Sequence, residues 1–457
     1  MASEENRTPE STTTTTTART SAAVPDTTPD AREPGEPGTS GTSGKHGPGE
    51  EAGGAGTRVW RMRLLVVAIV LAALNLRPAI TSLGALLEEV RDGLGMSGSV
   101  AGLLTSVPPL CFAVFGVTAP RLARRFGPGA VVCAGMAAIA AGLLIRPYAG
   151  GTPGFLAASA LALMGIAVSN VLMPVIVKRW FPDRVGSMTG VYSMALAFGT
   201  SVAAAATVPV TGALGGNWQS GLAVWSALAA AAVLPWLGFV RDRGTPRADT
   251  SRAGHGTGEE RPALRITRSR TAWALAVFFG LQATAAYVTM GWMAQIYRDA
   301  GVPAGTAGLL LAVTMVMGVP LAFVIPRLAT RLPSQGPIAL ALGACGLAGY
   351  VGLYVAPAGG ALAWALLLGV SNCAFPLALT MVGMRAGTGA GVAQLSAFAQ
   401  STGYLISIPG PLLVGVLYQH SGGWGLPLAL MTALMIPQMV MGVLAGRDRT
   451  VEAEAAR

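Results

Sequence analysis

The sequence predicts an all-α membrane protein in which twelve transmembrane helices form two pseudo-symmetric six-helix bundles. Three observations carry this prediction: the composition, the spacing of apolar segments and an internal repeat. Of the 457 residues, 52% are hydrophobic and only 11% are charged, and the mean hydropathy is +0.56. Soluble domains carry about 25% charged residues. We therefore expect a bundle whose exterior faces acyl chains rather than water.

Residues 1–60 differ in composition from the rest of the chain. Ser11 is followed by six threonines, and the remainder is rich in Pro, Gly, Ser, Glu and Arg. Such a segment buries too little apolar surface to offset the entropy of ordering it. Its first residues also lack the apolar region of a signal peptide. We interpret it as a disordered cytoplasmic tail, with a regulatory docking tail as the alternative.

Twelve apolar segments follow, each close to the roughly 20 residues that cross a ~30 Å hydrocarbon core. Six lie within 61–240 and six within 271–446. The long loop between them, 241–270, holds eight arginines and four acids and is typical of a flexible cytoplasmic linker. Residues 447–457 are expected to form a second cytoplasmic tail. The expected limits of the spans are 62–87, 98–119, 129–145, 154–177, 186–208, 219–240, 271–295, 304–325, 337–355, 360–382, 391–416 and 425–445.

Basic residues are distributed unevenly over the loops. With the N-terminal tail inside the cell, the loops after the even-numbered spans hold 17 Lys and Arg, whereas the outer loops hold only Arg91, Arg146 and Arg298. The positive-inside rule then predicts a multi-pass protein of the plasma (inner) membrane with both termini in the cytoplasm. The net charge of +10 does not indicate nucleic-acid binding, because the basic residues form no single face.

The two halves repeat one another. Ala119-Pro-Arg-Leu-Ala-Arg-Arg125 follows the second span and Ile325-Pro-Arg-Leu-Ala-Thr-Arg331 follows the eighth, a separation of 206 residues. Ser169-Asn170 and Pro174 in the fourth span match Ser371-Asn372 and Pro376 in the tenth, a separation of 202. Parallel repeats of this kind build carriers whose substrate site lies near the bilayer midplane, between the halves.

Arg77 is a permanent cation near the middle of an otherwise apolar run. Insertion scales put an arginine at the centre of a membrane helix at about +2.5 to +3.5 kcal/mol, so such a charge usually faces a watery pathway or a polar ligand. Its planar guanidinium suits a bidentate anion. We predict that Arg77 binds substrate. Alternatively, it pairs with backbone carbonyls that Pro78 frees and only holds helices together.

The repeated Asn and Pro residues indicate further polar positions inside the spans. Each proline removes the donor to the carbonyl of the Asn four residues earlier, so each span offers an amide and an exposed carbonyl on one face. We therefore predict helix kinks at Pro78, Pro174 and Pro376. The other side chains predicted to complete the substrate site are Asn170, Gln282, Asn372, Gln400 and Tyr404.

Packing is the alternative for this polar set, since interhelical hydrogen bonds worth about 1 kcal/mol also use such side chains. Gln400 and Tyr404 are four residues apart and share a helix face. Three other aromatic residues are interpreted as interface or core aromatics: Tyr192, Tyr287 and Trp292.

Candidate gating residues lie near the span ends. At helical spacing, Thr81, Gly84 and Glu88 share a stripe with Arg77. Gly84 leaves that stripe open to a ligand or to a closely packed neighbour. Glu88, near the outer mouth, is predicted to be a gate partner or proton carrier, with a solvated helix end as the alternative. Basic residues of the repeated loops are also predicted to serve gating or coupling, namely Arg121, Arg125, Arg327 and Arg331.

The motifs resemble those of the major facilitator superfamily, although the loop signature Gly-x-Leu-Ala-Asp-Arg-x-Gly is degraded to Pro120-Arg-Leu-Ala-Arg124-Arg-Phe-Gly127. Arg124 replaces the acid, which puts in doubt a gating salt bridge that relies on that Asp. The chain is more specifically similar to the cyanate and 2-nitroimidazole transporter family. That resemblance implies transport of small anions or small polar heterocycles by alternating access. The segments that carry it are 75–82, 279–283, 395–404, 410–415 and 422–424.

The absence of certain residue types bears on proton coupling, enzyme activity and metal binding. No Asp, Glu or His lies inside a span away from its ends, so proton coupling stays open. Paired acids, a His-Glu-x-x-His helix and a phosphate-binding Gly-rich loop are also missing, so we expect no enzyme. We expect no cofactor and no metal, because the four cysteines lie isolated in apolar runs: Cys111, Cys133, Cys345 and Cys373.

The expected partners are a small-molecule substrate and the lipid bilayer, with protons as an open possibility. We expect no nucleic acid and a monomeric protein. A broad-specificity drug efflux carrier of the same fold is the main rival. A transporter-like sensor without flux is a second.

Overall fold

The structure is a computed structural model that describes residues 49–240 and 266–455. The chain divides into two compact units, Met1–Ala55 and Gly56–Arg457, and the second holds all the spans. Most of the tail predicted at 1–60 and of the linker predicted at 241–270 lies outside the described residues. Helix α1 begins at Gly49, ahead of the expected start of the first span.

The described residues are all-helical, without strands, and twelve helical segments are long and apolar enough to cross a membrane. The prediction of twelve spans is confirmed. Their limits are Trp60–Ala85, Gly98–Gly116, Pro128–Tyr148, Thr152–Trp180, Ser187–Ala213, Trp218–Leu237, Arg270–Asp299, Ala304–Arg331, Gly336–Val355, Ala361–Met384, Gly391–Ser421 and Gly425–Ala445.

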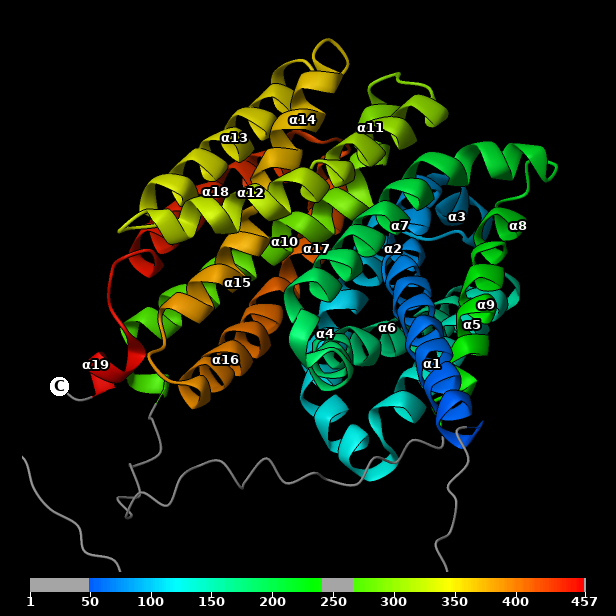
Figure 1. Ribbon diagram of the computed structural model, residues 1–457. Helices are drawn as coiled ribbons and strands as arrows, with labels where there is room; N and C mark the ends of the chain where they lie inside the picture. The colour runs from blue at the N-terminus through cyan, green and yellow to red at the C-terminus, as the bar shows by residue number, and fades with distance from the viewer. Residues whose placement is uncertain (1–48, 241–265, 456–457) are drawn as a thin grey trace, which may run out of the picture. The chain divides into compact units, whose positions relative to one another are not determined.

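Several spans consist of two helices (Figure 1). The first half contains α1 (Gly49–Asn75), α2 (Pro78–Ala85), α3 (Leu87–Leu94), α4 (Gly98–Phe126), α5 (Pro128–Ile145), η1 (Arg146–Tyr148), α6 (Thr152–Trp180), η2 (Pro182–Arg184), α7 (Val185–Ala213), α8 (Trp218–Ala223) and α9 (Trp225–Leu237). The second half contains η3 (Ile266–Arg268), α10 (Arg270–Asp299), α11 (Ala304–Val316), α12 (Gly318–Arg331), α13 (Gly336–Val355), α14 (Ala361–Ser371), α15 (Ala374–Met384), α16 (Gly389–Ser407), α17 (Pro409–Ser421), α18 (Gly425–Ala445) and α19 (Val451–Ala455).

The interruptions within spans have local causes. The first span breaks between Asn75 and Pro78, where proline cannot donate to the preceding turn. The eleventh breaks before Pro409 for the same reason. In the tenth, Asn372 and Cys373 form a turn ahead of Pro376, and the carbonyl of Asn372 accepts from the amide of Phe375 instead. The fourth span, by contrast, carries Pro174 inside one continuous helix, α6.

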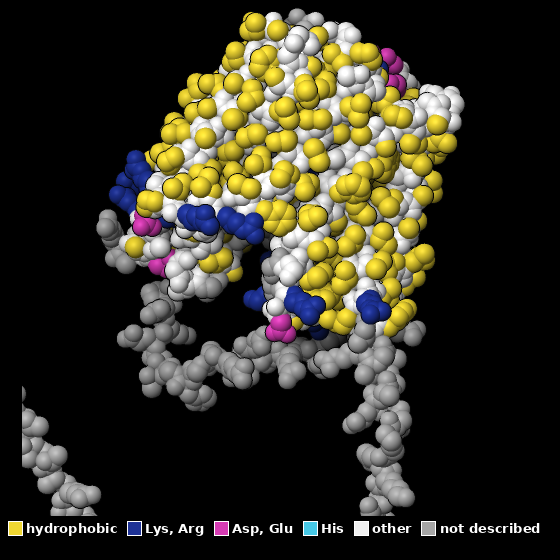
Figure 2. Space-filling view, turned by 45° about the horizontal axis from the view of Figure 1, so that its top comes forward, with side chains coloured by type: hydrophobic (Ala, Val, Ile, Leu, Met, Phe, Trp, Pro, Cys, Tyr) yellow, Lys and Arg dark blue, Asp and Glu magenta, His cyan; other side chains and the backbone are white. Residues whose placement is uncertain are grey.

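Small residues allow close packing within each half. Helix α5 packs on α6 and α9, and in the second half α10 packs on α16 and α18. Where α5 meets α6, the backbones of Gly135 and Gly165 lie so close that neither position has room for a Cβ. In lipid, where apolar side chains gain little by leaving the solvent, such contacts drive helix association. Many other large apolar side chains are exposed, and Figure 2 shows a mostly hydrophobic face with Lys and Arg gathered along one edge.

The two ends of the bundle differ in charge. We call the end formed by the loops after the even-numbered spans the basic end. Among its exposed side chains are Arg124, Arg125, Lys178, Arg179 and Arg184. The opposite end carries acids as well as arginines, including Glu88, Glu89, Arg298 and Asp299.

The two halves meet most closely toward the opposite end. There α2 packs on α10, α4 on α17 and α7 on α11. A Cβ on Gly84 would overlap the carbonyl oxygen of Met290 in α10, and one on Gly102 would lie 2.9 Å from the carbonyl oxygen of Leu412 in α17. Likewise, a Cβ on Gly308 of α11 would lie 2.7 Å from the carbonyl oxygen of Ala204 in α7. Only glycine permits this backbone approach.

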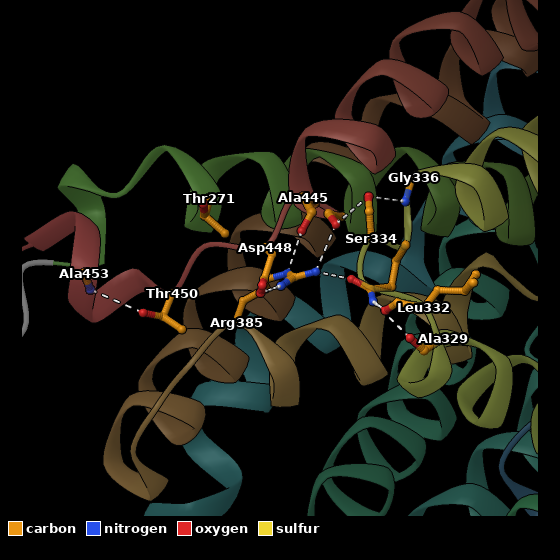
Figure 3. A network of polar contacts seen from close by, with 12 residues as sticks. Thr271, Ala329, Leu332, Ser334, Gly336, Arg385, Ala445, Asp448, Thr450 and Ala453 are labelled. Carbon is orange, nitrogen blue, oxygen red and sulfur yellow. Dashed lines mark hydrogen bonds and ion pairs between the residues drawn. The ribbon is translucent and has the colours of Figure 1, made fainter. Parts of the chain in front are cut away.

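The residues after α18, expected to be a tail, are anchored by a buried arginine (Figure 3). Arg385 is 1% exposed and donates to the backbone carbonyls of Ala445 at 3.1 Å and Gly446 at 2.9 Å. It also donates to the side chain of Gln335 and pairs with Asp448 at 3.2 Å. One guanidinium thus joins the ends of α13, α15 and α18.

Helix α19 then caps two other helices. The Glu454 carboxylate accepts from Thr271 N at 3.1 Å and from the hydroxyls of Ser269 and Thr271, at the start of α10. The Glu452 carboxylate accepts from the amides of Gly387 and Thr388, at the start of α16. A carboxylate near a helix N-terminus also interacts favourably with the helix dipole.

The hydrogen bonds that Glu452 and Glu454 accept are expected to break in acid. Burial alone would raise the pKa of Glu454, but the hydrogen bonds from Ser269 and Thr271 outweigh it and lower the pKa. The pKa of Glu452 is lowered in the same way by Gly387 and Thr388. A lowered folded-state pKa gives stability that is present above the unfolded-state value of about 4.3 and lost as the pH falls through the folded-state value.

A fluorescent probe on Ala453→Cys should therefore become more mobile as the pH falls below about 4. The double variant Glu452→Gln, Glu454→Gln should show that mobility already at neutral pH. Equal anisotropy in both proteins at pH 7 would contradict the capping role.

Candidate functional site

Arg77 lies at the break in the first span, between α1 and α2, and is half-buried. Its carbonyl accepts from the amides of Ile80 and Thr81, so the start of α2 is fixed by the residue that carries the charge. Thr81 adds a hydrogen bond from its hydroxyl to the same carbonyl at 3.2 Å. Within the described residues no carboxylate forms a salt bridge with Arg77. Its main chain is thus fixed by the start of α2, and none of the described carboxylates serves as its counter-ion.

Three tyrosines from both halves surround this cation. Tyr287 of α10 lies within hydrogen-bonding reach of Arg77. Tyr192 of α7 and Tyr404 of α16 lie within electrostatic range of it. All three phenols are wholly or largely buried. One guanidinium and three hydroxyls, drawn from two bundles, can donate several hydrogen bonds to one small ligand.

Asn170 joins this group through Tyr192. The Tyr192 hydroxyl donates to the Asn170 side-chain oxygen, which connects α6 to α7 next to Arg77. This hydrogen bond orients the phenol and leaves the Asn170 amide nitrogen as a further donor.

Aromatic rings form one wall of the site. Tyr404 stacks on Phe112 of α4 with ring centroids 5.0 Å apart. Phe279 of α10 meets Tyr404 edge-on at 5.1 Å, and Phe375 lies 5.8 Å from Phe279. The Phe112 contact crosses between the halves, so a ligand beside Tyr404 touches both bundles.

The remaining predicted polar residues are not joined to Arg77. Gln282 is buried, and its side-chain oxygen has no hydrogen-bond partner. Gln400 donates to Ser396 at 2.7 Å within its own helix. Asn372 lies in the turn between α14 and α15. The structure records no hydrogen bond among these three side chains in the part of the chain it describes.

The predicted gating residues fall at both ends of the bundle. Glu88 forms a salt bridge of 2.8 Å with Arg298, and Glu89 forms another of 2.8 Å with the same guanidinium. These bridges connect α3 of the first half with α10 of the second. Gly84 is packed against Met290 of α10 and also borders a small cavity. The side chains at the basic end are all exposed: Arg121, Arg125, Arg327 and Arg331.

Tyr192 and Tyr287 were interpreted as interface or core aromatics, and Tyr287 belongs to the buried core, with Tyr192 packed against it. Both also lie within electrostatic range of Arg77. Nothing in a single span distinguishes a core tyrosine from a site tyrosine, because the distinction depends on the other half. Glu89 and Arg298 were missed for a similar reason, whereas Trp292 is a core residue that donates to the Thr105 hydroxyl at 3.2 Å.

A model of the family described as Major Facilitator Superfamily matches residues 65–398. The chain belongs to the Major Facilitator Superfamily. It is 33% identical over 389 residues to the uncharacterized transporter YycB of Bacillus subtilis (strain 168), covering 85% of this chain and 94% of that protein. It is also 33% identical over 396 residues to the 2-nitroimidazole transporter of Escherichia coli (strain K12), covering 85% and 96%.

A third relative of this Major Facilitator Superfamily chain is the cyanate transport protein CynX of Escherichia coli (strain K12), 28% identical over 379 residues, covering 82% of this chain and 96% of that protein. The similarity to the cyanate and 2-nitroimidazole transporter family is thereby confirmed. Solved structures share the fold. The nucleoside transporter NupG has a TM-score of 0.64 at 14% identity, covering 83% of this chain and 98% of that chain. The inward-open xylose transporter XylE of E. coli has 0.63 at 12%, covering 86% and 98%.

Proposed function

We propose that the protein carries a small anion or a small polar heterocycle, cyanate-like or nitroimidazole-like, across the plasma membrane by alternating access. The observation that carries this proposal is Arg77, which forms no salt bridge among the described residues and has tyrosines of both halves nearby. The names of two relatives, a 2-nitroimidazole transporter and a cyanate transport protein, support the same substrate classes.

The chemistry of the site suits ligands of this kind. A guanidinium attracts a delocalised negative charge and donates two parallel hydrogen bonds to it. Neutral phenols add hydrogen-bond donors without adding charge. The site therefore attracts a small anion without binding it so tightly that it cannot be released. Phe112, Phe279 and Tyr404 offer aromatic surfaces to a flat ring. Gln282, Asn372 and Gln400 remain predicted members of the site in a conformation with the halves closed around substrate.

For the transport cycle, we propose that the halves rock about this site. The glycine contacts of Gly84 and Gly102 and the salt bridges of Arg298 close the opposite end. The basic end faces the cytoplasm by the positive-inside rule, with both termini there. Glu88 would then be a gate residue on the outer side, joined by Glu89. Four exposed arginines of the basic end would favour one orientation of the cycle, namely Arg121, Arg125, Arg327 and Arg331.

Proton coupling in this proposal has one candidate location. The spans carry acids only near their ends, and those nearest the path are Glu88 and Glu89. Protonating either would weaken its bridge to Arg298 and favour opening. We propose a monomeric carrier that performs no chemistry on its substrate and needs no cofactor.

The test is transport in cells that overexpress the chain. Accumulation of labelled cyanate or labelled 2-nitroimidazole should change relative to cells expressing Arg77→Gln at the same level, rising for import and falling for export. Unchanged accumulation of both, together with new resistance to lipophilic cations, would instead identify the rival drug efflux carrier. A growth response without any flux would identify a sensor.

A further inference from the structure

Arg146, counted from the sequence among the outer loops, is buried inside the first half. It follows α5 directly, at the start of η1, and is 2% exposed. The reason is that α6 and α8 pack on η1, while the Arg146 side chain reaches α2, where it binds Ala79 and Ser82. Among the described residues, Arg146 and Arg385 are thus the two arginines with buried side chains, whereas Arg77 is half-buried.

The partners of Arg146 leave its charge uncompensated. Its guanidinium donates to the carbonyl of Ala79 at 2.9 Å and to the hydroxyl of Ser82 at 3.3 Å, and lies 5.9 Å from the Phe155 ring centre. Its Nε is buried without a partner. None of the described carboxylates pairs with it. A buried charge of this kind is costly unless an opposite charge or full hydrogen bonding compensates it.

A small cavity lies against this guanidinium. Arg146 and Ser159 line it from the first half, and Tyr287 and Gly291 from α10 of the second half. The Ser159 hydroxyl is 1% exposed and, like the Arg146 Nε, has no partner. Two unpaired buried donors, one of them on a cation, therefore border the same small space.

We propose that this cavity is a second anion site, which binds a monovalent anion of about halide size between Arg146 and Ser159. A water molecule would satisfy the hydrogen bonds but leave the charge uncompensated, whereas an anion meets both needs. The proposal goes beyond the central site, since it uses neither the charge nor the substrate of Arg77.

The cavity lies between Arg77 and the opposite end of the bundle. Arg146 binds Ala79 and Ser82 of α2, which lie beyond Arg77 toward the opposite end. Tyr287 borders the cavity and also contacts Arg77, so it separates the two cations. When α10 moves away from α2, the wall made by Tyr287 and Gly291 is removed. The anion site then opens toward the opposite end, ahead of Arg77.

The experiment measures the thermal stability of the purified protein in sodium bromide or chloride against sodium gluconate at constant ionic strength. Wild type should show a saturable rise of about 2 to 5 °C. Arg77→Gln should show the same rise, because the second site is intact. Arg146→Gln and Ser159→Ala should lose most of it. A wild type without a halide response, or a wild-type response in both Ser159→Ala and Arg146→Gln, would overturn the proposal.

If Arg146→Gln does not fold, Ser159→Ala alone tests whether the cavity binds an anion, since it removes one hydroxyl and leaves the cation in place. Arg91→Gln, a change at a half-buried arginine of the same end, serves as the control and should keep the wild-type response. The outcomes also separate this site from the transport proposal. If Arg77→Gln loses transport but keeps the halide response, the result supports both the transport proposal and the second anion site. If the wild type shows no transport but a normal halide response, only the transport proposal is rejected.

Discussion

Arg77→Gln should lower the rate of substrate transport by about 10- to 100-fold, because a charge-assisted hydrogen bond is worth about 1.5–3 kcal/mol. The variant should stay folded. Arg77 has no carboxylate partner among the described residues, so its removal leaves no buried acid unpaired. The melting temperature should therefore stay at or above the wild-type value.

Initial rates in proteoliposomes, together with thermal melting in detergent, measure both effects. Arg77→Lys keeps the charge but loses the planar guanidinium, so its transport rate should fall between those of Arg77→Gln and the wild type. Arg184→Gln removes an exposed arginine of the basic end and should leave the rate unchanged. If Arg77 only holds helices together, Arg77→Gln will instead melt earlier and transport at a near-normal rate per folded molecule.

Gly84→Ala should abolish transport while leaving the protein inserted and folded. The added Cβ would overlap the carbonyl oxygen of Met290, a backbone atom that no rotamer change can move away. Helices α2 and α10 then cannot approach, so the opposite end cannot close. A carrier that cannot close one end cannot alternate, and the population should shift toward the form open at that end.

Two measurements test this effect. Transport by Gly84→Ala should fall to background, and a cysteine placed at Thr105, on the contact face with α10, should react faster with an aqueous thiol reagent than in the otherwise wild-type protein. Gly212→Ala is the matched control, because a Cβ there meets nothing within 4 Å. In a helix, Gly to Ala is otherwise stabilising by about 0.5–1 kcal/mol. Normal transport by Gly84→Ala would show that closure does not use this contact.

The spans were predictable because each obeys a local rule of length and hydropathy. The expected limits match the observed helices to within a few residues, and the twelfth, Gly425–Ala445, agrees at both ends. The break in the first span could be placed because Pro78 acts on its own helix. The matched motifs of the fourth and tenth spans did not give matched helices: α6 is continuous through Pro174, whereas Asn372 and Cys373 separate α14 from α15.

The site was predictable only in part, because it is built from contacts between segments far apart in the sequence. Arg77 is exceptional within its own span, so the sequence alone identifies it. Tyr192 and Tyr287 are ordinary within theirs, and only the approach of α7 and α10 brings them near Arg77. The burial of Arg146 could not be predicted: it ends its helix, as a loop residue does, but α6 and α8 pack on η1, which begins with it.

The capping of α10 and α16 by Glu454 and Glu452 has a consequence for biosynthesis. Both carboxylates leave the ribosome after the twelfth span, whereas the helices that they cap are made as the seventh and the eleventh. The two helices that carry Tyr287 and Tyr404 therefore have only their own capping side chains, Ser269 and Thr388, until translation has passed residue 454. Assembly of the second bundle is therefore completed from its C-terminal side. A chain that stops before Glu452 can be inserted in the membrane but lacks the hydrogen bonds of Glu452 and Glu454 to the starts of α16 and α10.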